Sequence, residues 1–440
     1  MHPTLADLHR THVTSLQSAY ERILSDTGQD AILIHGGSIQ LKTNADDQYW
    51  PLRATPHFQH WLALSEAEAA LLVRPGKKPL LLRPSEVSFW ESPAPLPGEF
   101  LLESFEVHRY PSWESLKSLL PARTAFVGDA GARAAILGIE AVNDKELVKK
   151  LDALRVEKTA YEVACLAEAN RIAARGHDRV RDAFFGGETS ELALHLAYLS
   201  ATSQDDPETP YKNIVALGRH AATLHHVTYA KDASGAPSLL LDAGATYFGY
   251  CSDVTRTWLA SGSGAGASTF RGMLEAADAM QQRLVAGATV GRKYESLHDE
   301  SHREVSKILH DTKLVRLSID EIDAKGISRA FYPHGLGHSL GLQCHDVGCA
   351  TSKPRADNPF LRNTEVIAKD QVFTIEPGIY FIEPLLQALR AEAHGAAVDW
   401  VLLDALTPFG GIRIEDDVVV RAEGPVRNLT REALKPTSAG

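Results

Sequence analysis

The sequence contains little cysteine and no long apolar run. Its four cysteines show no CxxC spacing, and a chain of this size needs no disulfides to hold its core together. A run of about 18 apolar residues, which a transmembrane helix requires, does not occur. The charged N-terminus also lacks the apolar core of a signal peptide. Together these absences predict a cytoplasmic protein with no membrane partner.

An excess of positive charge is also missing. The formal net charge is -11, which argues against nucleic acids and anionic membranes as main partners. The glycine-rich residues 262–266 are not followed by Lys-Ser or Lys-Thr, so they predict a flexible turn rather than a phosphate-binding loop. A length of 440 residues indicates roughly two to three domains.

The apolar pattern predicts an α/β (α+β) protein with two domains. Residues 1–28 fit an amphipathic helix, and short apolar runs predict strands at 31–34, 70–73, 79–82 and 125–127. We therefore expect a small α/β domain over residues 1–157. The charged helical pattern of residues 143–180 leads into a second domain, 158–440, with helices expected at 269–286 and 294–310.

Residues 46–61 are unusually aromatic for a loop, with Tyr49, Trp50, Phe58 and Trp61. One interpretation is a packed surface loop, which we favour for Phe58 and Trp61. The other is a lid over a binding site, possible for Trp50 if the protein is a homodimer and the loop reaches the partner chain.

Two of the cysteines flank a histidine. Cys344 and Cys349 stand on either side of His345, an arrangement that allows a thiolate metal site. Because both cysteines lie among Leu, Val and Gly, we favour a pair of buried free thiols.

Five residues in the second half of the chain would together hold two metal ions. Four carboxylates and one imidazole suit Mn(II), Co(II) or Zn(II), and such a pair of ions makes hydroxide available near neutral pH. This chemistry is metal-assisted hydrolysis. The residues are Asp242, Asp253, His338, Glu376 and Glu415.

The first two ligands fit a β-hairpin. An apolar run ends at Asp242, and the alternating residues 247–258 contain Asp253. Adjacent strands lie about 4.8 Å apart, so the two carboxylates can face one ion pair. The alternative, in which Asp242 caps a turn and Asp253 pairs with Arg256, is disfavoured because three further segments fit the same site.

A glycine-rich stretch, residues 333–346, contains three histidines: His334, His338 and His345. Its GxGxxxG spacing differs from the GxGxxG of dinucleotide-binding loops, and a histidine lies inside it, so we reject that interpretation. Glycines allow a backbone to approach a metal or a substrate closely.

The remaining carboxylates lie at strand ends. Glu376 follows an apolar strand and precedes Pro377-Gly378, and Glu415 shares a strand face with Arg413, two residues before it. A simple Arg413–Glu415 salt bridge is the alternative, but it leaves Glu376 unexplained.

These segments resemble one known family over nearly the whole chain. It is the family of pita-bread-fold metallopeptidases, and the match is closest to the bacterial Xaa-Pro dipeptidases (prolidases), which include organophosphorus acid anhydrolases. The resemblance rests on five segments in the same order and spacing: PYKNIVALGRHAATLHH, LLLDAGATYFGYCSDVTRTW, PHGLGHSLGLQCHDVG, TIEPGIYFIE and PFGGIRIEDDVVV.

The resemblance implies a role for each matching residue. Asp253 and Glu415 would bridge two divalent ions, most often Mn(II), with Asp242 completing one and His338 and Glu376 the other. Glu376 would also be the general base for hydrolysis of the bond before proline. The remaining implied residues are His225 and His345 at the reacting group, and His334, His345, Arg362, Arg413 and Tyr211 around the substrate.

Some questions stay open at the level of sequence. The family usually has His-Tyr where this chain has His225-His226, which bears on substrate preference. An aminopeptidase acting on longer Xaa-Pro peptides is the first alternative, although the insertion at residues 382–408 resembles the dipeptidase branch. A non-enzymatic binding protein of the same fold is the second, and it is disfavoured because all five ligands are present. Activity on organophosphate esters is a further possibility.

Overall fold

A computed structural model describes residues 3–45, 47–85, 95–96, 98–262, 264–350 and 352–434. The chain forms two compact units, Met1–Ala164 and Cys165–Gly440. This division falls inside helix α5 (Ala160–Phe185), close to the boundary that we predict near residue 157.

The first unit contains a five-stranded mixed sheet in the order β4-β3-β2-β1-β5. The pairs β1–β2 and β2–β3 are antiparallel, whereas β1–β5 and β3–β4 are parallel. Four of the strands match the predicted apolar runs. The fifth, β4, was not predicted, because most of its side chains are exposed and it contains no apolar run. The strands are β1 (Ala31–His35), β2 (Ala70–Val73), β3 (Leu80–Pro84), β4 (Glu106–Tyr110) and β5 (Thr124–Val127).

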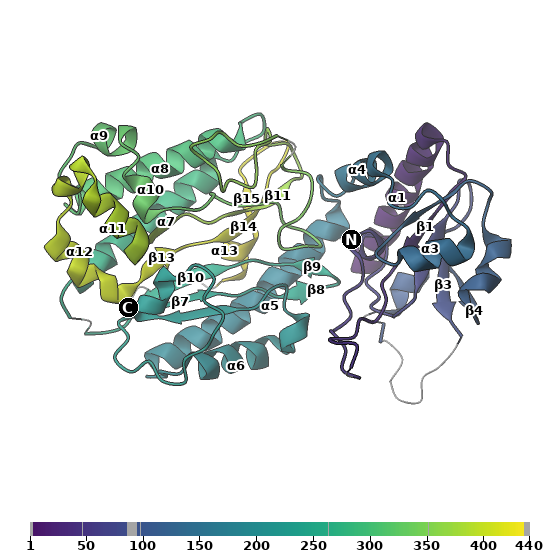
Figure 1. Ribbon diagram of the computed structural model, residues 1–440, viewed down its shortest axis with the longest axis horizontal. Helices are drawn as coiled ribbons and strands as arrows, with labels where there is room; N and C mark the ends of the chain where they lie inside the picture. Colours follow the sequence, from purple (N-terminus) through teal and green to yellow (C-terminus); the bar gives the residue numbers. More distant parts are fainter. Residues whose placement is uncertain are drawn as a thin grey trace. The chain divides into compact units, whose positions relative to one another are not determined.

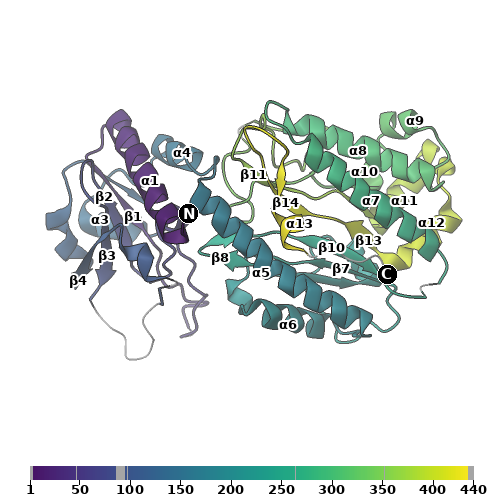
Figure 2. The ribbon, with the colours of Figure 1, turned by 180° about the vertical axis from the view of Figure 1, so that it is seen from behind.

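Helices cover both faces of this sheet. The long α1 (Leu5–Thr27) begins at a capping box made by Thr4 and Asp7 and ends at Gly28, whose φ of 69° is left-handed. Figures 1 and 2 show α1 and α3 on opposite faces of the sheet. The shorter helices are α2 (Pro56–Gln59), α3 (Gly131–Leu137) and α4 (Lys145–Ala153), with 3₁₀ turns η1 (Glu99–Leu102) and η2 (Trp113–Leu119).

The aromatic loop divides into buried and exposed side chains. Phe58 and Trp61 are buried, as we predicted, whereas Tyr49 and Trp50 are 47% and 59% exposed. The Lys42 ammonium lies 5.7 Å from the centre of the Trp50 ring. Asp46, at the start of this loop, lies outside the described residues.

The second unit is built around several small antiparallel sheets. They have the strand orders β10-β7-β6, β11-β14-β15, β12-β13 and β8-β9. An isolated bridge between Thr255 and Glu415 connects the β10-β7-β6 sheet to the segment that leads into β14. The strands are β6 (Ile214–Leu217), β7 (Ser238–Asp242), β8 (Thr246–Tyr247), β9 (Tyr250–Cys251), β10 (Thr255–Leu259), β11 (Val372–Ile375), β12 (Gly378–Tyr380), β13 (Gly411–Arg413), β14 (Asp416–Val419) and β15 (Arg427–Asn428).

Helices enclose these strands from two sides. In Figures 1 and 2, α5 and α6 run along one side of the strands and α7 and α8 along the other, the layered arrangement that the family resemblance implies. The helices predicted at 269–286 and 294–310 are present as α7 and α8. The helices are α6 (Glu191–Thr202), α7 (Ala267–Gly287), α8 (Tyr294–Asp311), α9 (Ile319–Ala324), α10 (Ser328–Phe331), α11 (Glu383–Ala391), α12 (Trp400–Leu406) and α13 (Leu429–Ala433).

Among the described residues, no helix combines the length and apolar character needed to cross a membrane.

Candidate active site

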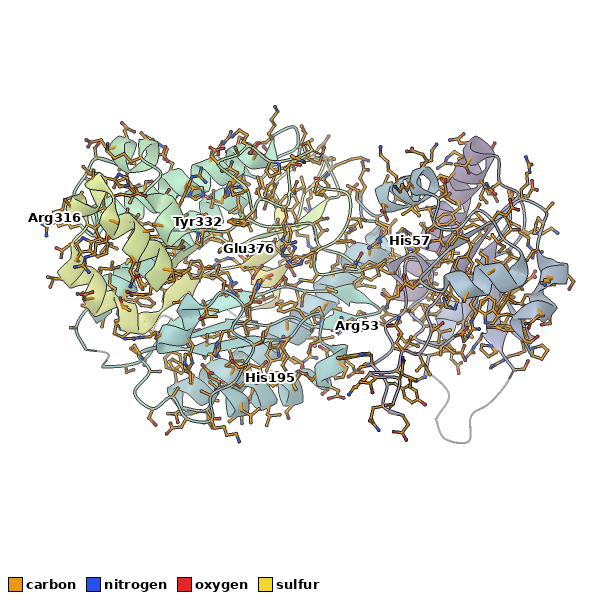
Figure 3. All side chains as sticks on the ribbon, viewed as in Figure 1. Arg53, His57, His195, Arg316, Tyr332 and Glu376 are labelled. Carbon is orange, nitrogen blue, oxygen red and sulfur yellow. The ribbon has the colours of Figure 1, made fainter. Side chains whose placement is uncertain are left out.

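A cavity of about 790 Å³ opens in the second unit. All five predicted metal ligands line it, together with every predicted substrate-binding and catalytic residue; Figure 3 labels Glu376 among them. Part of the cavity wall is apolar. It is formed by Ile214, Leu224, Val227, Phe360, Ile382, Pro384 and Leu385.

The two aspartates approach each other beside β7. Asp242 is the last residue of β7, which pairs with β10 on one edge and β6 on the other. The predicted hairpin needs one correction: Asp253 does not lie on the second strand but just before β10 begins, because the short β8–β9 ribbon intervenes. The Tyr211 hydroxyl oxygen lies 2.7 Å from Asp242 Oδ1 and 2.5 Å from Asp253 Oδ1, so it joins the two carboxylates.

Glu415 reaches the same place through the bridge to β10. The Thr255 hydroxyl donates to Glu415 Oε2 over 2.5 Å. Donor atoms of Asp253, His338 and Glu415 all lie within 4.8 Å of one another. Residues far apart in the sequence are therefore brought to the spacing that one cation requires.

His338 and Glu376 are placed by β11. The backbone of His338 exchanges hydrogen bonds with Thr374 on that strand, and Glu376 follows its last residue. Gly337 makes this approach possible, since a Cβ there would lie 2.1 Å from the Thr374 carbonyl oxygen. The imidazole Nε2 of His338 lies 3.4 Å from Asp253 Oδ2 and 3.6 Å from Glu376 Oε1.

Burial and crowding shift the ionisation of these groups. Burial, with the neighbouring carboxylates, raises the pKa of Glu376 to about 7 and that of Glu415 well above its usual value. Burial alone would also raise the pKa of Asp253, but the hydrogen bond and charge of His338 lower it to about 2. The same partnership outweighs the burial of His338 and raises its pKa to about 9. So much buried negative charge is typical of a cation site.

Arg413 is buried and is directed at Asp242. Its Nη2 donates to Asp242 Oδ2 over 2.6 Å, and its Nη1 donates to the Tyr380 hydroxyl over 3.0 Å. Its Nε donates to Thr255, the residue that also contacts Glu415. Arg256, the alternative partner of Asp253 in the sequence, instead pairs with Asp416.

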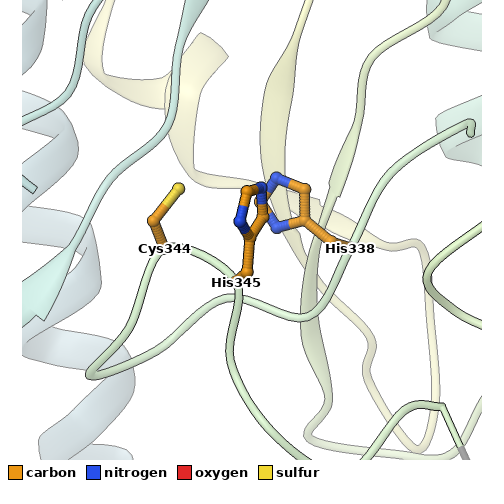
Figure 4. A group of neighbouring side chains, drawn as sticks. All are labelled: His338, Cys344 and His345. Carbon is orange, nitrogen blue, oxygen red and sulfur yellow. The ribbon is translucent and has the colours of Figure 1, made fainter. Parts of the chain in front are cut away.

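The remaining predicted residues surround the cavity. His225, His345 and Arg362 are exposed at its wall. The His345 ring packs edge-on against His338, with ring centres 4.4 Å apart (Figure 4). His334 is half-buried, with Nδ1 3.7 Å from Glu376 Oε2 and Nε2 2.8 Å from the Tyr380 hydroxyl. Burial lowers the pKa of His334 to about 3.

The expectation for Cys344 needs correction. Both cysteines are free and Cys349 is buried, but Cys344 is only partly buried. Its thiol lies at the cavity wall and contacts Asp253 Oδ2 at 3.0 Å (Figure 4 shows it beside His338). The residues around Cys344 in the sequence did not indicate its contact with Asp253.

Two residues near the ligands escaped the sequence analysis. Tyr380 contacts both His334 and Arg413, and Thr255 contacts both Arg413 and Glu415. Each lies inside a segment already singled out, Thr255 two residues after Asp253 and Tyr380 four after Glu376. Their positions in these segments were the only available signal.

Fold and site together define a two-domain metallopeptidase. Residues 164–422 match the family described as "Metallopeptidase family M24", and residues 7–152 match "Xaa-Pro dipeptidase, N-terminal domain". The chain belongs to metallopeptidase family M24.

Relatives with known names agree with this assignment over the full length. A protein of Aeromonas hydrophila named "Xaa-Pro dipeptidase" is 39% identical over 97% of this chain and 99% of its own. A second protein of that name, from Marinobacter nauticus, is 39% identical over 97% of this chain and 98% of its own. Among solved structures, proline aminopeptidase P II of Yersinia pestis is 22% identical with a TM-score of 0.73, covering 97% of both chains. At that identity, the likeness concerns the fold alone.

Proposed function

We propose that this protein is an Xaa-Pro dipeptidase that hydrolyses the peptide bond before a C-terminal proline. The observation that carries the proposal is the convergence of four carboxylates and His338 in one cavity. The match to the dipeptidase N-terminal domain and the full-length relatives of that name support the substrate class.

We propose two divalent ions per chain as the cofactor, with Mn(II) favoured and Co(II) or Zn(II) as alternatives. The donors fit: they are hard oxygen and nitrogen atoms, and three of them lie within 4.8 Å of one another. Asp253 and Glu415 would contact both ions, Asp242 one, and His338 and Glu376 the other. When bound, such ions polarise a carbonyl group and lower the pKa of water.

Glu376 is the proposed general base. It lies among the proposed ligands in the cavity wall, and a carboxylate held there can accept a proton from the attacking water and release it near neutral pH. It would take a proton from the attacking water and deliver it to the proline nitrogen that leaves. The nearby His334 is neutral at that pH, because burial lowers its pKa to about 3.

Residues at the cavity wall would bind the dipeptide. His225 and His345 are proposed to contact the carbonyl group that reacts, and good hydrogen-bond donors to a developing oxyanion are each worth about 3 kcal/mol. Arg362, which is exposed at the wall, can pair with the substrate carboxylate through its planar guanidinium. Tyr211, His334 and Arg413 complete the proposed substrate-binding set.

An aminopeptidase that accepts longer peptides is the alternative. Ile382, Pro384 and Leu385, at the start of the 382–408 insertion, lie in the cavity wall, so the insertion that resembles the dipeptidase branch contributes to the proposed site. A homodimer, a cytoplasmic location and a side activity on organophosphate esters remain proposals.

Hydrolysis of Ala-Pro and Ala-Pro-Ala by the protein loaded with Mn(II), Co(II) or Zn(II) tests these ideas. We expect Ala-Pro to be cleaved and Ala-Pro-Ala to be resistant, and metal analysis to give two ions per chain. Equal cleavage of both peptides would favour the aminopeptidase. No hydrolysis with any ion would refute the peptidase.

A further inference from the structure

Glu191 is a fully buried acid outside the cavity with four hydrogen-bond donors. It is the first residue of α6, and its side chain is 0% exposed. Oε1 accepts from the Leu217 amide over 2.9 Å and from His220 Nδ1 over 2.6 Å. Oε2 accepts from the Ala230 amide over 2.7 Å and from His226 Nε2 over 2.9 Å.

These contacts determine which ring nitrogens of His220 and His226 carry hydrogen. The donors together outweigh the effect of burial, so the pKa of Glu191 lies below its usual value and the group is a carboxylate. A carboxylate only accepts hydrogen bonds, so both ring nitrogens must carry hydrogen. The two imidazoles stack with their centres 4.6 Å apart, and each supplies one N–H to a different oxygen.

The donors enclose one segment of the chain. Leu217 ends β6, and Ala230 lies at the far end of the connection that follows. Between them, one 3₁₀ turn, η4 (Gly218–Ala222), is the regular structure found among the described residues. This connection supplies Leu224, His225 and Val227 to the cavity wall.

Neighbouring residues of this connection face opposite ways. His225 lines the cavity, whereas the adjacent His226 turns its ring to Glu191 and is only 11% exposed. Because His226 is covalently next to His225, holding one ring also limits where the other can go. Displacing a group at the reaction centre by about 1 Å can lower turnover roughly a hundredfold.

We propose that Glu191 is a positioning residue that acts through His226 to hold His225 against the substrate. The inference rests on the proposed function, since it assumes that His225 contacts the reacting group. Glu191 itself touches no substrate. Its charge is needed because an amide in its place would present hydrogens to some of the four donors.

A double-mutant cycle tests the proposal. In the parent, Glu191→Gln should lower kcat for Ala-Pro about ten- to a hundredfold, with KM and metal content within threefold. In a His225→Ala background, the same change should lower kcat less than twofold, because the group it positions is gone. An equal loss in both backgrounds would show that Glu191 only stabilises the fold, and would overturn the proposal.

A second pair of variants avoids the risk of misfolding at the buried acid. His226→Gln keeps an N–H for Glu191 and should retain kcat within about threefold, whereas His226→Leu should lose as much as Glu191→Gln. Equal kcat for the two variants would also overturn the inference. Failure of the proposed function appears separately, as a parent protein that leaves Ala-Pro intact, and it would overturn both ideas.

Discussion

The Arg413 guanidinium donates to Asp242 Oδ2 over 2.6 Å, and both side chains are almost completely buried. The sequence suggested Glu415 as the ion-pair partner of Arg413 or, by resemblance, a substrate carboxylate. In the structure, Arg413 pairs with Asp242, one of the proposed ligands, and reaches Glu415 through Thr255; its contact with a substrate stays a proposal. Its contribution should therefore depend on whether the metal is bound.

Arg413→Ala should destabilise the metal-free protein more than the Mn(II)-loaded protein. Removing one partner of a buried ion pair costs about 3–5 kcal/mol because the other charge stays uncompensated, but a bound cation would compensate Asp242. Urea midpoints measured with EDTA and with Mn(II) give the comparison. Arg83→Ala, which removes a 2.6 Å pair with Glu66 in the first unit, is the matched control and should lose stability equally in both conditions. If Arg413→Ala lost as much stability with Mn(II) as with EDTA, the contribution of Arg413 would not depend on the metal, and the prediction would be contradicted.

Asp253→Asn should abolish metal binding and activity together. Its carboxylate contacts Tyr211, His338 and Cys344, and an amide cannot supply the charge that two cations need. Metal content and turnover of Ala-Pro are the measurements, with the exposed Asp182→Asn as control. A variant with two ions per chain and normal turnover would exclude a bridging role.

Glu376→Gln should be folded and inactive, with kcat at least a hundredfold below the parent, because general-base catalysis contributes about 10²–10⁴-fold. Circular dichroism checks the fold and a Mn(II) titration checks metal binding. Turnover within tenfold of the parent would mean that Glu376 is not the base.

Acid should destabilise the first unit through His12. Burial lowers the pKa of His12 to about 4, so the unfolded chain takes up a proton below pH 6.5 that the folded chain does not. Its stabilising contribution is thus present above pH 6.5 and is lost as the pH falls towards 4, by about 3 kcal/mol in all. Urea unfolding of His12→Gln should show a shallower decline over this range, with exposed His108→Gln as control. An unchanged slope would contradict the assignment.

Trp50→Ala tests whether the aromatic loop closes the cavity of a partner chain. Because Trp50 is 59% exposed, we expect little change in melting temperature but faster cleavage of Ala-Pro-Ala relative to Ala-Pro. The buried Phe58 is the contrast: Phe58→Ala should cost about 3–5 kcal/mol in stability and leave the length preference unchanged. A large stability loss for Trp50→Ala with unchanged preference would refute the lid.

The sequence predicted strands and ligands where short-range patterns determine them. The apolar runs before Asp242 and before Glu376 form strands, as predicted. Such strands can be recognised in the sequence because consecutive apolar side chains indicate burial. The strand β4, with four exposed side chains of five, carries no such signal.

Side-chain partners were harder to predict, because they depend on the tertiary fold. The thiol of Cys344 contacts Asp253, 91 positions earlier, and nothing in the sequence around Cys344 indicates this partner. The partner of His226 is Glu191, 35 positions away, and nothing in the local pattern of either residue indicates the other. Family resemblance located residues, but only the structure relates them to one another.

The Thr255–Glu415 hydrogen bond joins positions 160 residues apart. Closing so long a loop is entropically unfavourable, and contacts of this range form slowly. During synthesis, Asp242 and Asp253 leave the ribosome well before Glu415 exists, so a growing chain has only part of the donor set. Because both proposed ions need Glu415, they would bind only after it has been made, and would stabilise the folded chain by mass action rather than guide its folding.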